Sequence, residues 1–222
     1  MKPHRPAKMD AAMTLTEVVV VVFVLAVLVV IILPMLARTR HRYNMTNCMS
    51  NLKQIGLSFR EWAGDNGGKF PMQVSMANGG TRELAAKGDV VATFQIMSNE
   101  LCTPKILVCA MVAEQLESSK RFAADFSSDL KYHISYFIGL DAGTNSPQAF
   151  LSGDDNFETG GVPVKSGLQL FSTNAPIAWT AARHHFAGFL LFADGSVQWP
   201  SNSDLVFEFQ QTGLATNRLA IP

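Results

Sequence analysis

The residues best suited to chemistry lie near the carboxyl end, where His184 and His185 precede Asp194. An imidazole and a carboxylate could act as a general acid–base pair or bind a metal ion. If residues 188–193 form a strand, Asp194 lies about 20 Å from its start, at about 3.3 Å per residue. His184 comes before that strand, so the two side chains meet only if the chain doubles back. We therefore expect Asp194 and Gly195 to form a turn and His184 to hold the preceding loop, with contact to a partner as the alternative and no enzymatic role.

Three acidic residues, Asp154, Asp155 and Glu158, lie close together in the polar stretch "SGDDNFETGG". Calcium prefers several oxygen ligands, which carboxylates in a flexible loop often supply. The spacing here does not match an EF-hand loop, which needs acids or amides at alternate positions. We expect a solvated polar loop, with calcium binding as the alternative and no other cofactor.

The chain has three cysteines, Cys48, Cys102 and Cys109, which allow at most one disulfide. Zinc binding is a weak interpretation, because no CxxC or paired cysteine–histidine spacing is present. Outside the cytoplasm Cys109 could pair with either of the other two, and the sequence does not choose between them. No nucleophile motif or phosphate-binding loop occurs, so an anchored hydrolase is only a remote alternative.

Glu17 stands directly before sixteen apolar residues, Val18 to Leu33. The uncharged stretch continues to Ala37, and its twenty residues span about 30 Å as a helix, enough to cross a bilayer core. A cleaved signal peptide is a poorer fit, because it has a shorter apolar core followed by small residues. A simple signal anchor explains the length but not Glu17, since a carboxylate in lipid is costly without a cation.

The charges in the rest of the chain argue against a nucleic-acid partner and do not fix the orientation of the helix in the membrane. The chain has 18 basic and 18 acidic residues and no basic stripe in its body, so no nucleic-acid surface is expected. Three basic residues precede the apolar run and three arginines follow it, so the positive-inside rule does not fix the topology.

An amphipathic helix is expected to continue beyond the apolar run. Apolar residues recur there at steps of three and four, as on one helical face: Met45, Cys48, Leu52, Ile55, Phe59 and Trp62. The glycines and proline of "GDNGGKFP" end this pattern. One helix is thus predicted from about Thr14 to Ala63.

The rest of the chain predicts an α+β domain, in which a small antiparallel sheet packs on the amphipathic half of the helix. The stretch 188–199 indicates a hairpin with Asp194 and Gly195 as a two-residue turn. Short helices are expected to end at 97–101 and to lie within 112–125. Further strands are expected at 132–138, 148–156, 176–182 and 204–209.

The stretch "AMTLTE" and the apolar run resemble the prepilin cleavage and methylation motif of type IV pilins and type II secretion pseudopilins. The resemblance implies cleavage by a prepilin peptidase between Ala12 and Met13, followed by methylation of Met13. Thr14 and Leu15 fit the motif, and Glu17 becomes the fifth residue of the mature chain. In such filaments the glutamate of one subunit is thought to neutralise the amino-terminal amine of its neighbour, which fixes the register of assembly.

Pro34 adds to this resemblance, because it falls at mature position 22, where pilins commonly carry a helix-kinking proline. Two residues depart from the family's usual pattern. Ala12 stands where the family usually has glycine, and Met13 stands where it usually has phenylalanine.

A second resemblance links both ends of the chain to pilin-like proteins of planctomycetes and verrucomicrobia. The stretches "NLKQIGL" and "KFP" are similar to theirs, and so is the spacing of His184, nine residues, then Asp194 and Gly195. The middle of the chain, about 75–130, is covered poorly.

These resemblances imply a pilin-like fold and a subunit of a type II secretion-like or type IV pilus-like filament. Its partners would be the prepilin peptidase, other pilin-like subunits and an inner-membrane assembly platform. The expected position is single-pass in the inner membrane, with a cytoplasmic amino terminus and a periplasmic domain. The alternative is an anchored extracytoplasmic binding module that does not polymerise. The expected parts are a leader (1–12), a membrane helix (13–37), its amphipathic continuation (38–66) and a globular domain (67–222).

Overall fold

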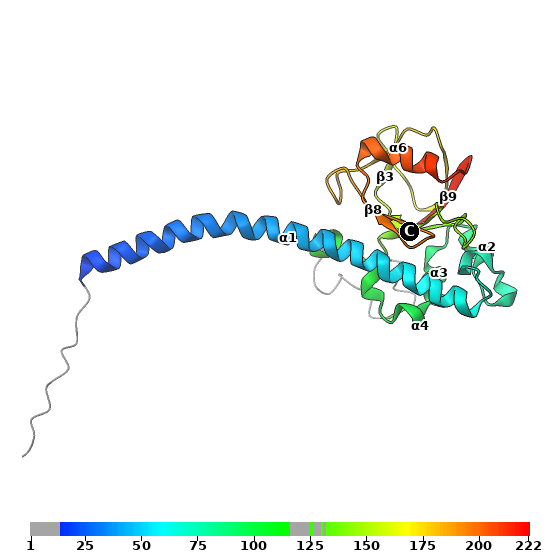
Figure 1. Cartoon of the computed structure of the whole chain (residues 1–222), viewed down its shortest axis with the longest axis horizontal. Coiled ribbons are helices and arrows are strands. Elements are labelled where there is room, and N and C mark those ends of the chain that lie inside the picture. The colour runs from blue at the N-terminus through cyan, green and yellow to red at the C-terminus, as the bar shows by residue number, and fades with distance from the viewer. Residues whose placement is uncertain (1–13, 116–124, 127–129, 131) are drawn as a thin grey trace, which may run out of the picture. The chain divides into compact units, whose positions relative to one another are not determined.

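The computed structural model describes residues 14–115, 125, 126, 130 and 132–222, and the chain divides into two compact units, Met1–Tyr43 and Asn44–Pro222. The predicted leader and Met13 lie outside the described residues, as does most of the helix expected within 112–125. Helix α1 (Leu15–Asp65) extends through both units (Figure 1), close to the predicted bounds.

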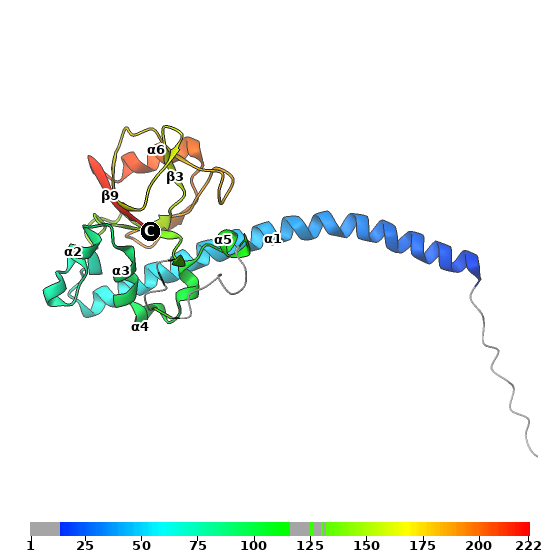
Figure 2. The same ribbon diagram turned by 180° about the vertical axis from the view of Figure 1, so that it is seen from behind.

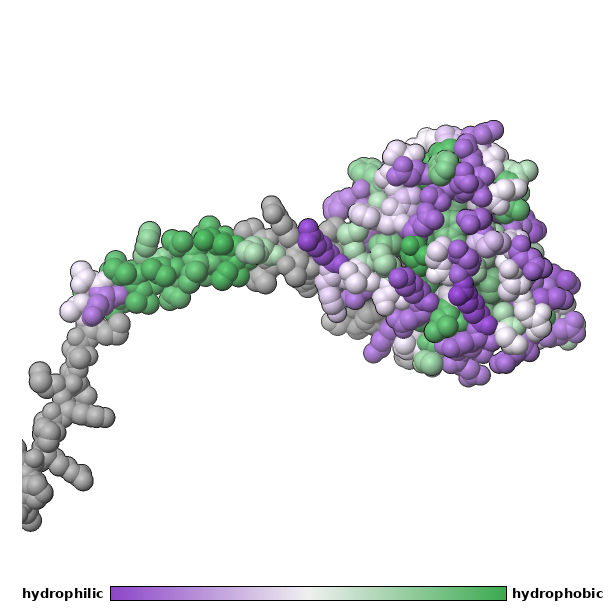
Figure 3. All heavy atoms as spheres, viewed as in Figure 1, coloured by the Kyte–Doolittle hydropathy of each residue, from purple (hydrophilic) through white to green (hydrophobic). Residues whose placement is uncertain are grey.

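In the first unit, the part of α1 from Val18 to Leu33 exposes apolar side chains all around. The segment Leu15–Leu33 has a mean hydropathy of 3.3 and none of it is buried, and Figure 3 shows its continuous apolar side chains. It is the one helix among the described residues that is long and apolar enough to cross a membrane. Its length and composition are compatible with a single-pass membrane anchor.

In the second unit, α1 buries the predicted stripe. Cys48, Leu52, Ile55 and Phe59 are fully buried and Trp62 is nearly so, which confirms the three-and-four spacing as a core-facing surface. The helix ends at Asp65, and Gly67 and Gly68 follow in left-handed conformations, which glycine adopts without steric cost. This half of α1 belongs to the main hydrophobic core of the domain.

Two antiparallel sheets form the β part of the domain. The six-stranded sheet has the order β5-β9-β1-β2-β7-β8, and the three-stranded sheet has the order β4-β3-β6. The strands are β1 Tyr136–Gly139, β2 Phe150–Asp154, β3 Phe157–Thr159, β4 Val162–Pro163, β5 Gly167–Ser172, β6 Ile177–Trp179, β7 Leu190–Phe192, β8 Val197–Gln198 and β9 Thr216–Ile221. The prediction of an α+β domain with an antiparallel sheet is confirmed.

The strands β1, β2 and β7 of the large sheet are buried on both faces. Tyr136 and Ile138 of β1 join the core that contains the α1 stripe, whereas Phe137 joins a second core with aromatic residues of the small sheet and α6 (Asn202–Gln211). Figures 1 and 2 show α6 and β3 on the side of the sheet away from α1. The predicted alternation of Tyr136 and Ile138 is therefore correct, although β1 is shorter than the predicted strand.

Short helices connect α1 to β1 along the chain. Their bounds are η1 Pro71–Gln73, η2 Met76–Asn78, α2 Arg82–Ala85, α3 Val90–Ile96, α4 Ser98–Leu101, η3 Pro104–Leu107 and α5 Ala110–Gln115. Helix α4 lies where a helix was expected to end, at 97–101. The last turn before α5 carries Cys109 into the main core.

The strand predicted at 204–209 is wrong, because these residues lie in α6. The Ser201 hydroxyl donates to the carboxylate of Asp204 at 2.6 Å at the start of the helix. Leu205 and Phe209, four residues apart, are the buried members of this helix. The same stretch therefore fits a helical face as well as the apolar–polar alternation of a strand. The carboxyl-terminal strand is instead β9, which pairs with β1 and β5.

The predicted hairpin is present as β7 and β8, but its turn is longer than two residues. The Phe192 N–H donates to the Ser196 carbonyl at 2.9 Å, so three residues, Ala193 to Gly195, form the turn between this pair. Leu191 pairs with Val197, and the Gly195 N–H donates to the Phe192 carbonyl at 2.9 Å. Gly195 has a φ of +81°, as expected for the left-handed position that closes such a loop. The Asp194 carboxylate accepts from the Ser196 N–H at 2.7 Å, so the two signature residues shape the turn.

Candidate functional site

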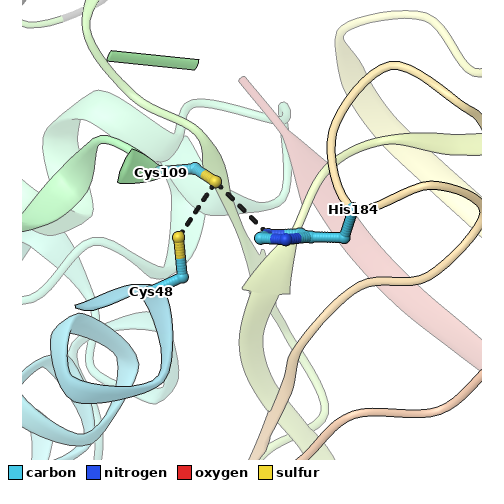
Figure 4. Close-up of side chains that lie close together, drawn as sticks. All are labelled: Cys48, Cys109 and His184. Carbon is cyan, nitrogen blue, oxygen red and sulfur yellow. Dashed lines mark hydrogen bonds between the residues drawn. The ribbon is translucent and has the colours of Figure 1, made fainter. Parts of the chain in front are cut away.

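Two cysteines and a histidine from distant segments meet inside the domain (Figure 4). Cys48 comes from α1, Cys109 from the turn before α5, and His184 from the loop between β6 and β7. The two Sγ atoms are 3.2 Å apart, and the Cys109 Sγ lies 3.4 Å from the His184 Nε2. All three residues are buried, so this cysteine–histidine cluster is closed to solvent.

Asp154 extends the cluster from the end of β2. Its Oδ2 lies 3.3 Å from the His184 Nε2 and accepts the Phe189 N–H at 2.8 Å. The Phe189 carbonyl in turn accepts the Asp154 N–H at 2.9 Å, so the pair continues the ladder between β2 and β7. Asp154 is fully buried, which corrects the expectation that it stands in a solvated loop.

Arg183 supplies a second cation to the same place. Its guanidinium forms an ion pair with Asp155 and lies 3.7 Å from Asp154 Oδ1. The Nη1 atom also donates to the Ser135 carbonyl at 2.6 Å, just before β1. Arg183 and His184 together therefore tie the loop before β7 to the ends of β1 and β2.

This pairing speaks against the calcium alternative. Asp154 and Asp155 face a guanidinium and an imidazole, which occupy the positions that a cation would need. Glu158 lies two residues beyond Asn156 on β3, half-buried and paired by its backbone to Ala178 and Pro163. The three acids therefore do not form a shared set of oxygen ligands.

The protonation of His184 follows from its partners. Burial lowers the pKa of the imidazole, but the hydrogen bonds to Asp154 and Cys109 outweigh this and raise the pKa to about 10. His184 is then an imidazolium at neutral pH, with its Nε2–H directed between the carboxylate and the thiol. Its Nδ1 is buried and makes no hydrogen bond with the described residues. For Asp155, burial raises the pKa to about 6, although Arg183 acts in the opposite direction.

The donor types of the cysteine–histidine cluster are those of a zinc site, and the ligand atoms lie within 4.8 Å of one another. A tetrahedral zinc ion with Zn–S bonds of about 2.3 Å holds its sulfurs about 3.8 Å apart. The two sulfurs here are closer, at 3.2 Å. The Nε2 that would bind the ion is committed to Asp154 as a proton donor. The arrangement fits a thiol pair beside a charge pair better than it fits a metal site.

The two thiols differ in their surroundings. Hydrogen bonds from the Cys109 thiol and from the Ala110 N–H, at 3.2 Å, lower the pKa of Cys48 despite burial. The same hydrogen bond and burial raise the pKa of Cys109. A negative charge in this pair therefore rests preferentially on Cys48. Cys102 is exposed and stands apart from the cluster.

The carboxylate of Glu17 has a local partner at the start of α1. Its Oε2 accepts the Thr14 N–H at 2.8 Å and the Thr14 hydroxyl at 2.9 Å, and the Glu17 N–H points back to that hydroxyl at 3.3 Å. This is a capping box, which the sequence "TLTE" encodes and which the sequence interpretation overlooked. Leu15 opens the helix in an exposed position, and Pro34 lies within it.

In the structure His184 contacts Asp154 and not Asp194. The strand geometry had predicted that His184 and Asp194 do not meet. The loop holds two unusual backbone positions, His185 and Phe186, with φ of +52° and +62°. Residues other than glycine adopt such conformations at some cost. The paired side chains of Arg183 and His184 are among the contacts that hold the loop against this cost.

The charge pair makes stability depend on pH. Because the pKa of His184 is raised from 6.5 to about 10, its contribution is fully present below pH 6.5 and is lost as pH rises through 10. We expect the free energy of unfolding to fall between pH 7 and 10 in denaturant titrations. A His184→Gln variant, which cannot titrate, should lack this part of the slope. Equal slopes for the two proteins would contradict the assignment of an imidazolium.

No protein-family model, no curated protein and no solved structure matches the chain.

Proposed function

We propose that this chain is a structural subunit of a filament that resembles a type IV pilus or a type II secretion pseudopilus. The observation that carries the proposal is the apolar helix Leu15–Leu33, which exposes its side chains on all sides and has one carboxylate, Glu17, at its start. It would be made as a precursor, cleaved between Ala12 and Met13, and held in the inner membrane with its domain outside.

The exposed apolar surface supports membrane anchoring. Soluble proteins rarely leave large contiguous apolar patches in water, whereas every side chain described from Val18 to Leu33 is exposed. Lipid covers such a surface without protein contacts. Because lipid is as apolar as the helix, apolar contact alone gives little drive for these helices to associate.

Glu17 gives the helix a charged group that can bind one specific partner, which the apolar surface cannot do. Both hydrogen bonds from Thr14 end at Oε2, so Oε1 takes none from the described residues. A free amine on a neighbouring mature subunit would meet this carboxylate in a medium of low dielectric constant, where an ion pair is stronger than in water. An unpaired member would be penalised there, so the pair favours one register of helix packing.

The domain suits a structural role. Its buried charge pair, Asp154 and His184, is closed to solvent, and the two side chains are directed at each other. Both side chains are used in stabilising the junction between loop and sheet. This supports assembly over catalysis as the purpose of the domain.

The mature amino terminus tests this proposal. Intact-mass and peptide mass spectrometry of protein extracted from membranes should show a chain that begins with methylated Met13. Ala12→Gly should be processed equally well, whereas Ala12→Glu should accumulate as the precursor, because the peptidase requires a small residue there. A chain that keeps Met1, or one cut after Leu33, would contradict the proposal.

A further inference from the structure

We propose that Cys48 and Cys109 are joined by a disulfide that fastens α1 to the segment before α5. Their Sγ atoms lie 3.2 Å apart although the residues are 61 positions apart in the sequence. Both side chains are fully buried in the main core. The sequence allowed Cys109 to pair with Cys48 or with Cys102, and the geometry points to Cys48.

The approach of the two sulfurs carries the argument. A disulfide places them about 2.05 Å apart, so the pair has to close by about 1 Å. The Cys102 side chain is exposed and donates to the Asn99 carbonyl at 3.4 Å. Cys102 thus remains a free thiol on the surface of the domain.

The neighbours of the pair suit thiolate chemistry. The Ala110 N–H points at the Cys48 Sγ at 3.2 Å, and the His184 ring lies 3.4 Å from the Cys109 Sγ. A backbone donor and a nearby imidazolium both stabilise negative charge on sulfur. Because the folded pair is closed to solvent, the first thiolate attacks an external disulfide before the core has closed over it, and the second thiol lies nearby.

The reaction balances as thiol–disulfide exchange. A thiolate of the pair attacks the disulfide of an oxidising protein or small molecule, forms a mixed disulfide and releases one thiol of that reagent. The second cysteine then attacks this mixed disulfide and releases the other thiol. The pair loses two protons and two electrons, and the reagent's disulfide is reduced to two thiols.

The bridge would have a mechanical consequence for a filament subunit. The first buried turns of α1 are the segment through which the domain is connected to the membrane helix. A covalent link at Cys48 would keep these turns attached to the domain when the anchor helix is pulled. This inference rests on the proposed function in one respect. Disulfides persist outside the cytoplasm, which is where the proposed function places the domain.

Thiol trapping tests the pairing. The full-length protein is extracted from membranes and denatured without reductant in the presence of N-ethylmaleimide, which alkylates free thiols. Peptide mass spectrometry then identifies the alkylated cysteines. We expect modification of Cys102 alone and a linked peptide containing Cys48 and Cys109. All three cysteines should react after reduction. Alkylation of both buried cysteines, or a link between Cys102 and Cys109, would overturn the proposal.

Matched variants separate the pair from the remaining thiol. Cys102→Ser should keep the bridge and its thermal midpoint, whereas Cys48→Ala should expose Cys109 to the reagent and lower Tm by about 10 °C. Reduction should lower the Tm of the wild-type protein by a similar amount and leave Cys48→Ala unchanged. Equal Tm values for reduced and oxidised wild-type protein would contradict a structural bridge.

An experiment in vitro tests the Cys48–Cys109 bridge independently of the cellular compartment of the protein. Purified, reduced, full-length protein is unfolded and refolded in a glutathione redox buffer, where the Cys48–Cys109 bridge is expected to form wherever the protein resides in the cell. If this bridge forms in the buffer but the cellular protein is reduced, the proposed location fails and the pairing stands. If the buffer yields another pairing, or metal analysis finds an ion held by the two thiolates, the pairing fails.

Discussion

Replacing Glu17 by glutamine is expected to leave the protein in the membrane but to reduce its incorporation into filaments at least tenfold. Glutamine keeps an oxygen that can accept the Thr14 N–H, so the capping box of α1 survives. The change removes only the negative charge. Without it, the amine of a neighbouring subunit would be buried in lipid with no partner, which costs several kcal/mol. Membrane fractionation and the yield of assembled material measure the two effects separately.

A change at Thr14 provides the matched control for this experiment. Thr14→Ala removes the hydroxyl that contacts Glu17 at 2.9 Å but keeps the backbone donor and the charge. It should weaken the helix start by about 1 kcal/mol and leave assembly close to the wild-type level. If Glu17→Gln assembles normally while Thr14→Ala fails, Glu17 acts only as a cap and its role in assembly is wrong.

Replacing Asp154 by asparagine is expected to lower the free energy of unfolding by about 3 kcal/mol or more. The Asp154 carboxylate is fully buried, faces the His184 imidazolium at 3.3 Å and accepts the Phe189 N–H at 2.8 Å. Asparagine has nearly the same shape but leaves the histidine without its anion. The loop with left-handed residues His185 and Phe186 would lose one of its buried attachments. The midpoint of denaturant unfolding measures the loss.

The adjacent acid is a matched control, because Asp155 pairs with the same loop through Arg183. Burial raises the pKa of Asp155 to about 6, so its charged form is less favoured in the folded protein than that of an ordinary aspartate. Asp155→Asn should therefore cost clearly less than Asp154→Asn at pH 7. Equal losses would show that the charge pair with His184 has no special weight.

The regular features of the fold could be predicted because each depends on local spacing. The apolar run, the stripe from Cys48 to Trp62 and the β7–β8 hairpin all follow from periodicity and turn residues. The segment 204–209 was mispredicted because its apolar residues fit a strand as well as a helix. The helix is favoured because α6 begins at Asn202 and buries Leu205 and Phe209 on one face. The three-residue turn depended on register, which the residue types alone do not fix.

The cysteine–histidine cluster could not be predicted in the same way. Its members come from α1, from the turn before α5 and from the loop before β7, so no sequence spacing connects them. Strand geometry correctly separated His184 from Asp194, but only the pairing of β2 with β7 brings Asp154 to His184. The signals in the sequence were weak. Cys48 stood on a buried stripe, and two acids ended a stretch that otherwise reads as a buried strand.

Photo-crosslinking from the apolar helix tests the central claim most directly. A photoreactive amino acid in place of Leu25, which is 55% exposed, would be activated in intact membranes of cells that carry the assembly machinery. Filament packing predicts adducts between this chain and another copy, or another subunit with a similar helix, and predicts their loss in Glu17→Gln. Adducts with lipid alone, or protein adducts that Glu17→Gln leaves unchanged, would contradict assembly through this helix.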